Sequence, residues 1–95
     1  MRAFYLLSYD VAEPKRWRRV HRVARDFGEP LQYSVFLCEL SEKDKAALEG
    51  KLKGIIHEEQ DQVMLVRLRA TEKPRDMIEC FGRPTSVLDR DLLIY

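Results

Sequence analysis

The fold is decided by two neighbouring stretches, RAFYLLSY at residues 2–9 and PKRWRRVHRVARDF at residues 14–27. The first is aromatic and aliphatic almost throughout, which is typical of a central strand covered on both faces. In the second, Pro14 stands where a first helical residue is favoured, and apolar side chains recur at helical spacing. Gly28 then ends the helix. The sequence therefore predicts a strand followed by an amphipathic helix.

The middle of the chain contains a long extended segment and a second helix. Residues 31–40 are either one long bent strand or two short strands that meet at a kink near Ser34. Ser41 followed by Asp44 resembles a capped helix start. The second helix is predicted over residues 42–56, and its apolar face consists of Leu48, Leu52, Ile55 and Ile56.

A polar turn at residues 57–62 leads to a predicted strand at residues 63–69. Residues 70–84 are irregular in pattern, and residues 86–94 are predicted as a last strand. One helix in each crossover indicates an α+β fold, a ferredoxin-like sheet with both helices on one face. Ten residues at 31–40 barely allow the two strands that this fold needs between its helices.

Length and composition predict one globular domain over residues 1–95, with 35% charged and 45% hydrophobic residues. We expect a cytoplasmic protein, because no apolar run approaches the roughly 20 residues of a membrane span and the N-terminus lacks the pattern of a signal peptide. Cys38 and Cys80 fit no metal-ligand spacing, and we expect both to be reduced, packed thiols.

The net charge is only +1, but the cations are unevenly placed. Residues 15–25 hold six lysines and arginines and no acid. The first helix relies on arginine, whose rigid fork matches phosphate oxygens, whereas the second uses lysines mixed with acids, as on an ordinary solvated face. Exposed helices also tolerate many arginines, so two alternatives remain for the first helix, a solvated face or a nucleic-acid backbone contact. The candidate contacts are Arg16, Arg18, Arg19 and Arg22.

Asp10 stands alone at the end of the apolar first strand. Aspartate often ends strands and opens turns through its own side-chain hydrogen bonds. A carboxylate here can also hold a hard metal ion, because Mg²⁺ takes one or two carboxylates together with substrate phosphates. One carboxylate per chain is few for such a site, and a two-fold dimer with two copies of Asp10 facing each other would complete it.

The remaining candidates have structural alternatives. Trp17 and Phe27 could stack on bases, although their helical spacing favours core packing. His21 and the other histidine, His57, have no metal-ligand partner at helical spacing and are interpreted as surface or structural residues. Ser34 lacks the partners of a nucleophile, so we expect local hydrogen bonding or a site-lining position. A ferredoxin-like small-molecule sensor is disfavoured, because the sequence contains no glycine-rich effector loop.

Several motifs together resemble the CRISPR-associated Cas-two (Cas2) family, the small partner of the CRISPR integrase. The resemblance rests on the first 42 residues, and the chain length and the strand at residues 63–69 agree with it. Tyr-Asp alone is a weak signal, but its combination with Gln-Tyr-Ser-Val-Phe at this separation is specific. The matching segments are Ser8-Tyr9-Asp10, Lys15-Arg16, Gly28, Gln32-Tyr33-Ser34-Val35-Phe36 and Leu40-Ser41-Glu42.

This resemblance implies a ferredoxin-like βαββαβ sandwich that forms a homodimer, with an extra C-terminal strand, about residues 86–95, packed on the partner subunit. It also implies a Mg²⁺-dependent endonuclease that acts on RNA or DNA in antiviral defence, and a complex with the CRISPR integrase that captures and integrates spacers. By position, Asp10 matches the family's catalytic, metal-binding aspartate. Tyr9, Arg16, Arg19, Ser34 and Phe36 match positions around it or in the adjoining motif, with Tyr9, Ser34 and Phe36 as expected site-lining residues.

The chain departs from the family pattern at two positions. Glu13-Pro14 stands where members commonly show an acidic pair, and Trp17 stands where a second consecutive basic residue is frequent. Two functional classes stay open, a metal-dependent phosphodiesterase and a non-catalytic scaffold that bridges DNA. The sparse acids favour the scaffold, and the position of Asp10 beside the dense arginines favours the nuclease.

Overall fold

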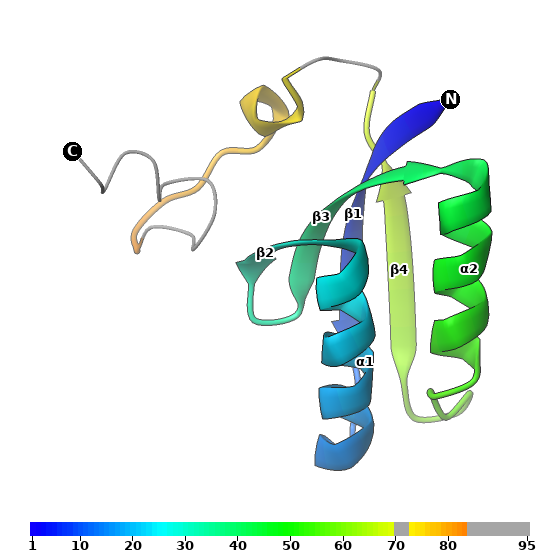
Figure 1. Ribbon diagram of the computed structural model, residues 1–95. Helices are drawn as coiled ribbons and strands as arrows, with labels where there is room; N and C mark the ends of the chain where they lie inside the picture. Colours follow the sequence, from blue (N-terminus) through cyan, green and yellow to red (C-terminus); the bar gives the residue numbers. More distant parts are fainter. Residues whose placement is uncertain (70–72, 84–95) are drawn as a thin grey trace.

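The computed structural model describes residues 1–69 and 73–83. Within this part of the chain, four strands, two α-helices and one short 3-10 helix follow one another (Figure 1). In chain order they are β1 (Arg2–Asp10), α1 (Pro14–Phe27), β2 (Gly28–Gln32), β3 (Val35–Ser41), α2 (Glu42–Lys53), β4 (Gln62–Arg67) and the 3-10 helix η1 (Pro74–Met77).

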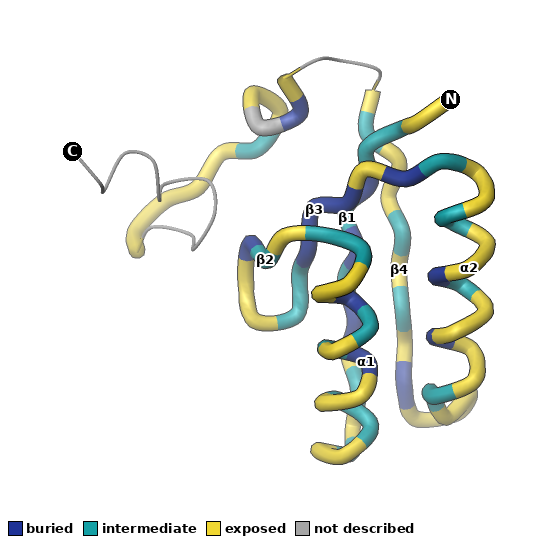
Figure 2. Tube along the Cα trace, in the orientation of Figure 1, coloured by how far each residue is buried: buried dark blue, intermediate teal, exposed yellow. Residues whose placement is uncertain are grey.

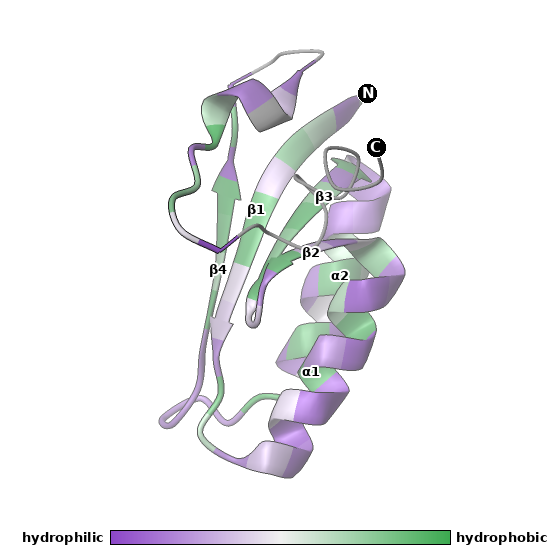
Figure 3. Cartoon of the chain, turned by 90° about the vertical axis from the view of Figure 1, so that its left-hand side faces the viewer, coloured by the Kyte–Doolittle hydropathy of each residue, from purple (hydrophilic) through white to green (hydrophobic). Residues whose placement is uncertain are grey.

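The four strands form one antiparallel sheet in the order β2-β3-β1-β4. Both α-helices cover the same face, and η1 lies on the opposite side of the sheet (Figure 3). This arrangement confirms the predicted α+β, ferredoxin-like sandwich. The predicted C-terminal strand, about residues 86–95, falls outside the described residues.

The extended segment between the helices consists of two strands, β2 and β3, that turn at Tyr33 and Ser34. The second of the two alternatives, a kink near Ser34, is therefore correct, and the first strand starts earlier than predicted, at Gly28. The pairing register shifts between Pro30 and Gln32, so this short hairpin is irregular before its turn.

The core lies between the sheet and the helices. In β1 the residues at alternate positions are buried, because successive side chains of a strand point to opposite faces. The same alternation in β3 places Phe36 and Cys38 on the helix-covered face. The buried cluster consists of Tyr5, Leu7, Tyr9, Val20, Ala24, Phe36, Cys38, Leu40, Leu48 and Leu52. Figure 2 shows the complementary exposed residues along the outer side of α1 and on β4.

The bounds of α1 agree with the prediction at both ends. Glu13 caps the first turn by accepting hydrogen bonds from the backbone N–H groups of Lys15 and Arg16. At the other end β2 begins at Gly28 with no intervening residue. A Cβ atom on Gly28 would lie 2.5 Å from Cys38 Sγ and 2.6 Å from the Leu37 carbonyl oxygen, so this junction needs glycine for close approach to β3.

The second helix starts as predicted and ends earlier. Ser41 and Asp44 form a reciprocal capping box. The helix ends at Lys53, and the prediction that it continues through residue 56 is wrong, because Gly54 ends the helix and the next two residues enter the turn. Ile55 and Ile56 still pack against the core from that turn.

The two cysteines differ in environment. Cys38 is buried, and desolvation raises the pKa of its thiol to about 11. Cys80 is exposed, so the prediction of two packed thiols is wrong for this residue, which follows η1 away from the core. Among the described residues, no helix is long and apolar enough to cross a membrane.

Candidate functional site

The end of β1 presents two consecutive polar side chains to opposite faces of the sheet. Tyr9 is buried among the core residues beneath α1, whereas Asp10 is exposed. Because side chains alternate along a strand, Asp10 lies on the open face with Ser8 and Leu6. The sequence neighbours Tyr9 and Asp10 therefore belong to two different surfaces.

On the open face, Asp10 pairs with Gln62 of β4, and the next pair on this face joins Ser8 with Met64. Met64 and Val66 are both 48% exposed, although they are apolar. Asp10 makes no side-chain hydrogen bond or ion pair with any other described residue. The open face thus combines an unpartnered carboxylate with exposed apolar side chains.

A second aspartate, Asp61, lies one residue before β4 and is buried. Its carboxylate accepts hydrogen bonds from the backbone N–H groups of Ala12 (2.9 Å) and His57 (2.8 Å). The Arg16 guanidinium adds an ion pair at 2.8 Å between Nε and Oδ2. The hydrogen bond from Arg16 is the main reason that the pKa of Asp61 lies far below its usual range. The two backbone donors lower this pKa further. Asp61 therefore ties α1 to the turn before β4.

Two residues near Asp10, Arg16 and Glu13, make hydrogen bonds that stabilise the fold. Arg16 is held by Asp61 and by the side-chain oxygen of Gln60. The backbone hydrogen bonds that Glu13 accepts lower its pKa, as expected for a carboxylate at a helix N-terminus. Among the predicted phosphate-binding arginines, Arg16 is thus already paired, whereas Arg18 and Arg19 are exposed.

Under α1, Tyr9 and His21 form a polar contact inside an aromatic cluster. Burial raises the pKa of the Tyr9 phenol well above its usual value, so this group keeps its proton. Desolvation, with a smaller contribution from Arg25, lowers the pKa of His21. The Tyr9 hydroxyl and His21 Nδ1 lie 2.7 Å apart and share a hydrogen bond. Phe36 packs beneath both rings and is completely buried.

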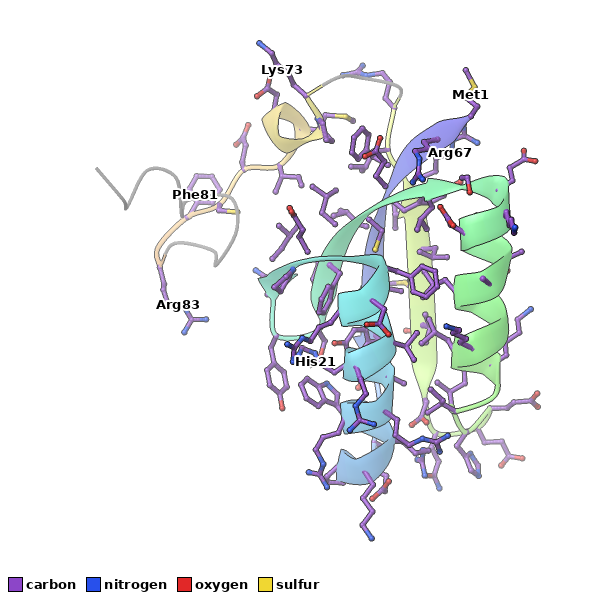
Figure 4. All side chains as sticks on the ribbon, viewed as in Figure 1. Met1, His21, Arg67, Lys73, Phe81 and Arg83 are labelled. Carbon is purple, nitrogen blue, oxygen red and sulfur yellow. The ribbon has the colours of Figure 1, made fainter. Side chains whose placement is uncertain are left out.

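Three rings continue this cluster as a stacked column, which we call the ring stack: His21, Trp17 and Tyr33. The ring centroids of His21 and Trp17 lie 4.5 Å apart at an interplanar angle of 15°. Those of Trp17 and Tyr33 lie 4.3 Å apart at 14°. Trp17 Nε1 also donates to Ser34 Oγ over 2.9 Å, which joins α1 to the β2–β3 turn. Figure 4 shows His21 on the side of α1 that faces this turn.

A row of arginines runs along α1 beside the ring stack. Arg18, Arg22 and Arg25 are exposed and follow one another at helical spacings of four and three residues, which places them on one face. Arg25 follows His21 by four residues, about one helical turn, so the arginine row borders the ring stack. This arginine row suits the phosphates of a nucleic acid.

For a metal ion, the described part of one chain offers few ligands. It contains no group of three or more His, Cys, Asp or Glu side chains that could hold a metal. Asp10 is still a suitable partial ligand, because its carboxylate is exposed and not committed to another group. A hard cation accepts one or two carboxylates with water and phosphate oxygens as further ligands.

Comparison with known proteins adds a family to this geometry. The family model described as CRISPR associated protein Cas2 matches residues 1–75 of the chain. The chain belongs to the Cas2 family. It is 33% identical over 90 residues to the protein named "CRISPR-associated endoribonuclease Cas2 1" of Rhodospirillum rubrum, a match that covers 95% of this chain and 88% of that protein.

Two further Cas2 proteins agree over most of the length. The Geobacter sulfurreducens protein named "CRISPR-associated endoribonuclease Cas2" is 29% identical over 94 residues, and the match covers 99% of both chains. The crystal structure of Streptococcus pyogenes Cas2 superposes with a TM-score of 0.73 at 26% identity, covering 83% of this chain and 99% of that one. The recognition of the Cas2 family from the sequence is confirmed.

Within this Cas2 chain, the predicted site residues divide between two surfaces. Asp10 stands on the open face, while Tyr9 and Phe36 lie buried on the helix-covered face. Ser34 lies at the β2–β3 turn and bonds Trp17. Within one subunit, the expected site-lining residues therefore do not surround Asp10. They support the ring stack instead.

Sequence reasoning missed two features of the site. Asp61 gave no signal, because the donors that surround it are distant in sequence or are backbone groups. Tyr33 is recognisable in the sequence only as part of the Gln32-Tyr33-Ser34-Val35-Phe36 motif, and its stacking on Trp17 is visible only in the fold. Aromatic residues at positions 9, 17, 33 and 36 were the available clue, since a ferredoxin-like topology brings α1 against the β2–β3 hairpin.

Proposed function

We propose that this chain is a Mg²⁺-dependent endonuclease of CRISPR adaptive immunity that hydrolyses phosphodiester bonds in RNA or DNA. The observation that carries the proposal is the position of Asp10, an exposed carboxylate without a partner among the described residues, on an open face with exposed apolar neighbours. The endoribonuclease names of the Rhodospirillum and Geobacter relatives support single-stranded RNA as the first substrate to test.

The partner that suits the open face is a second copy of this chain. Met64 and Val66 offer apolar surface that a symmetric partner would bury. In a two-fold dimer the same surface meets itself, so packing through this face brings two copies of Asp10 toward each other. The dimer supplies the second carboxylate that a single chain lacks.

The edge of the sheet supports the same dimer. The outer edge of β4 pairs with no strand among the described residues. Its backbone groups are therefore available to an added strand. The predicted C-terminal strand of the partner, about residues 86–95, is the segment that we propose for this position.

The roles of the residues follow from this arrangement. Asp10 of each subunit would hold Mg²⁺, and substrate phosphate oxygens would complete its ligands. Bound Mg²⁺ supplies Lewis-acid polarisation of a phosphoryl oxygen and lowers the pKa of a bound water. The arginine row and Arg19 hold phosphates of the same substrate by charge and hydrogen bonds. Asp61 and Arg16 keep the start of α1 in place beside Asp10.

The test is endonuclease activity of the wild type and Asp10→Ala on single-stranded RNA and on duplex DNA, with and without Mg²⁺. We expect cleavage by the wild type to require Mg²⁺ and Asp10→Ala to be slower by about a hundredfold or more, because a metal ligand is lost. Glu42→Ala is the control, since Glu42 is an exposed carboxylate at the start of α2 and belongs neither to the end of β1 nor to the arginine row. Its activity should equal that of the wild type.

The variants must also dimerise and bind nucleic acid as the wild type does. Equal cleavage by the wild type and Asp10→Ala, or cleavage that does not need Mg²⁺, would contradict the role of Asp10. Loss of activity together with loss of the dimer would mean that Asp10 supports assembly instead of chemistry.

A second candidate is a non-catalytic scaffold that bridges CRISPR integrase subunits on duplex DNA. One specific observation favours it: the arginine row lies on the helical layer, whereas Asp10 lies on the open face of the sheet. DNA can therefore be held by α1 without reaching the carboxylate. The same experiment separates the two candidate functions. If the wild type and Asp10→Ala both bind duplex DNA and neither cleaves it, the result supports the scaffold.

A further inference from the structure

Tyr33 is unusual among the described aromatic residues because it is ordered by stacking and yet remains exposed. Its exposed fraction is 76%, although the ring lies nearly parallel to Trp17 at 4.3 Å. Trp17 covers one face of the Tyr33 ring, so the exposure belongs to the opposite face and the edges. A ring that buries so little area contributes little to the core. The exposed face of the Tyr33 ring is therefore available to stack on a ligand.

Three hydrogen bonds hold the ring stack in place from behind. Trp17 donates to Ser34, which lies next to Tyr33 in the turn. Ser34 in turn accepts a backbone hydrogen bond from Tyr9 at 3.1 Å, which ties the turn to β1. At the inner end, the Tyr9 hydroxyl holds His21. A ligand that stacks on Tyr33 consequently meets a preorganised surface and loses little side-chain freedom in the protein.

The charge next to the ring stack is positive. The arginine row runs along the same side of α1, and Arg25 lies close enough to His21 to contribute to its lowered pKa. Residues 15–25 contain no acid that would neutralise it. An aromatic platform beside a line of guanidinium groups is the combination that binds single-stranded nucleic acid, in which bases stack and phosphates pair.

We propose that the outer face of Tyr33 stacks on an unpaired base of a single-stranded nucleic acid, whose neighbouring phosphates are bound by Arg18, Arg22 and Arg25. Base pairs within a duplex are closed to such a platform, so this surface selects unpaired segments. The inference deepens the nucleic-acid binding of the proposed function and depends on neither Asp10 nor Mg²⁺.

The test measures binding of the full chain to a single-stranded oligonucleotide of about ten nucleotides with one central 2-aminopurine, in the presence of EDTA. A second oligonucleotide has the same phosphates but abasic sites in place of bases. For Tyr33→Ala, we expect about a tenfold loss of affinity for the first, unchanged affinity for the second, and loss of the 2-aminopurine quenching that reports stacking. The salt dependence of binding should stay unchanged, because the arginines remain.

Two variants serve as controls. Tyr33→Phe keeps the ring and should bind and quench as the wild type does. Phe81→Ala removes another exposed aromatic residue, one that lies far from α1 (Figure 4), and should also leave binding unchanged. Both controls and Tyr33→Ala should melt at the same temperature as the wild type, since neither exposed ring belongs to the core.

The possible results are distinct. If the wild type binds but Tyr33→Ala binds equally well, or loses the same factor on the abasic oligonucleotide, the stacking proposal is wrong. If the wild type binds neither oligonucleotide, the nucleic-acid part of the proposed function fails as well. If Tyr33→Ala loses only the base-dependent affinity, the proposal holds, whatever the outcome of the cleavage experiment.

Discussion

The two faces of the sheet treat their polar groups in opposite ways. On the helix-covered side, the described residues include no buried side-chain nitrogen or oxygen without a hydrogen-bond partner, and Asp61 alone accepts four hydrogen bonds. On the open side, Asp10 has no such partner among the described residues, and its apolar neighbours are half exposed. The covered side is complete within one chain, whereas the open side has the composition of a surface that still needs a ligand or another subunit.

This contrast shows why two aspartates so close in space have different roles. A buried carboxylate must be paired, so Asp61 is committed to Arg16 and to backbone donors. The oxygens of an exposed carboxylate are not committed to protein donors, so they can coordinate a cation. The difference in environment, and not the residue type, makes Asp10 the candidate ligand.

The largest loss of stability is expected from a substitution in the core beneath the helix-covered face. Phe36→Ala should reduce the free energy of unfolding by about 3–5 kcal/mol, because it leaves a cavity beneath Tyr9 and His21. Met64→Ala on the open face should cost less than about 1 kcal/mol in the monomer. Urea unfolding at low protein concentration measures both. An equal loss for the two variants would show that the faces are not different in kind.

A smaller but still large effect is expected from the two aspartates. Asp61→Ala should lower the melting temperature by more than about 10 °C, because it leaves Arg16 and two backbone N–H groups without their hydrogen-bond acceptor. Asp10→Ala should change the melting temperature by less than about 3 °C, as an exposed substitution does. Thermal unfolding followed by circular dichroism decides between them. If Asp10→Ala were the more destabilising of the two, Asp10 would be a structural residue.

The smallest effect concerns acid. Since the pKa of Asp61 is lower in the folded than in the unfolded chain, its contribution to stability is complete above the ordinary aspartate pKa of about 3.9 and is lost as the pH falls below it. The wild type should therefore lose stability between about pH 5 and pH 2. Asp61→Asn should start less stable but show a shallower decline by up to one proton. Identical slopes would mean that the pKa of Asp61 is the same in the folded and the unfolded chain.

Local signals predicted the elements of the fold well. Pro14 and Gly28 mark the ends of α1 directly, and the Ser41–Asp44 pair marks the start of α2. The β2–β3 turn at Tyr33 and Ser34 has no glycine or asparagine, so the sequence left one bent strand as an alternative. Turn residues decide such boundaries, and here the turn is stabilised by a side chain from α1 instead.

The candidate site was predicted only in part. Asp10 was recognised because it interrupts an apolar run. Asp61 could not be recognised, since Arg16 lies 45 residues away and two of its donors are backbone groups. The ring stack joins residues from α1 and the β2–β3 turn, and only the fold shows that their rings lie nearly parallel and in contact.

The direct junction at Gly28 has a mechanical consequence. Because α1 passes into β2 without a connecting residue, the helix and the hairpin that ends in Tyr33 share no hinge. The spacing between the arginine row of α1 and Tyr33 in the hairpin therefore depends on this junction. Replacing Gly28 by any larger residue would push β2 away from Cys38 and change that spacing.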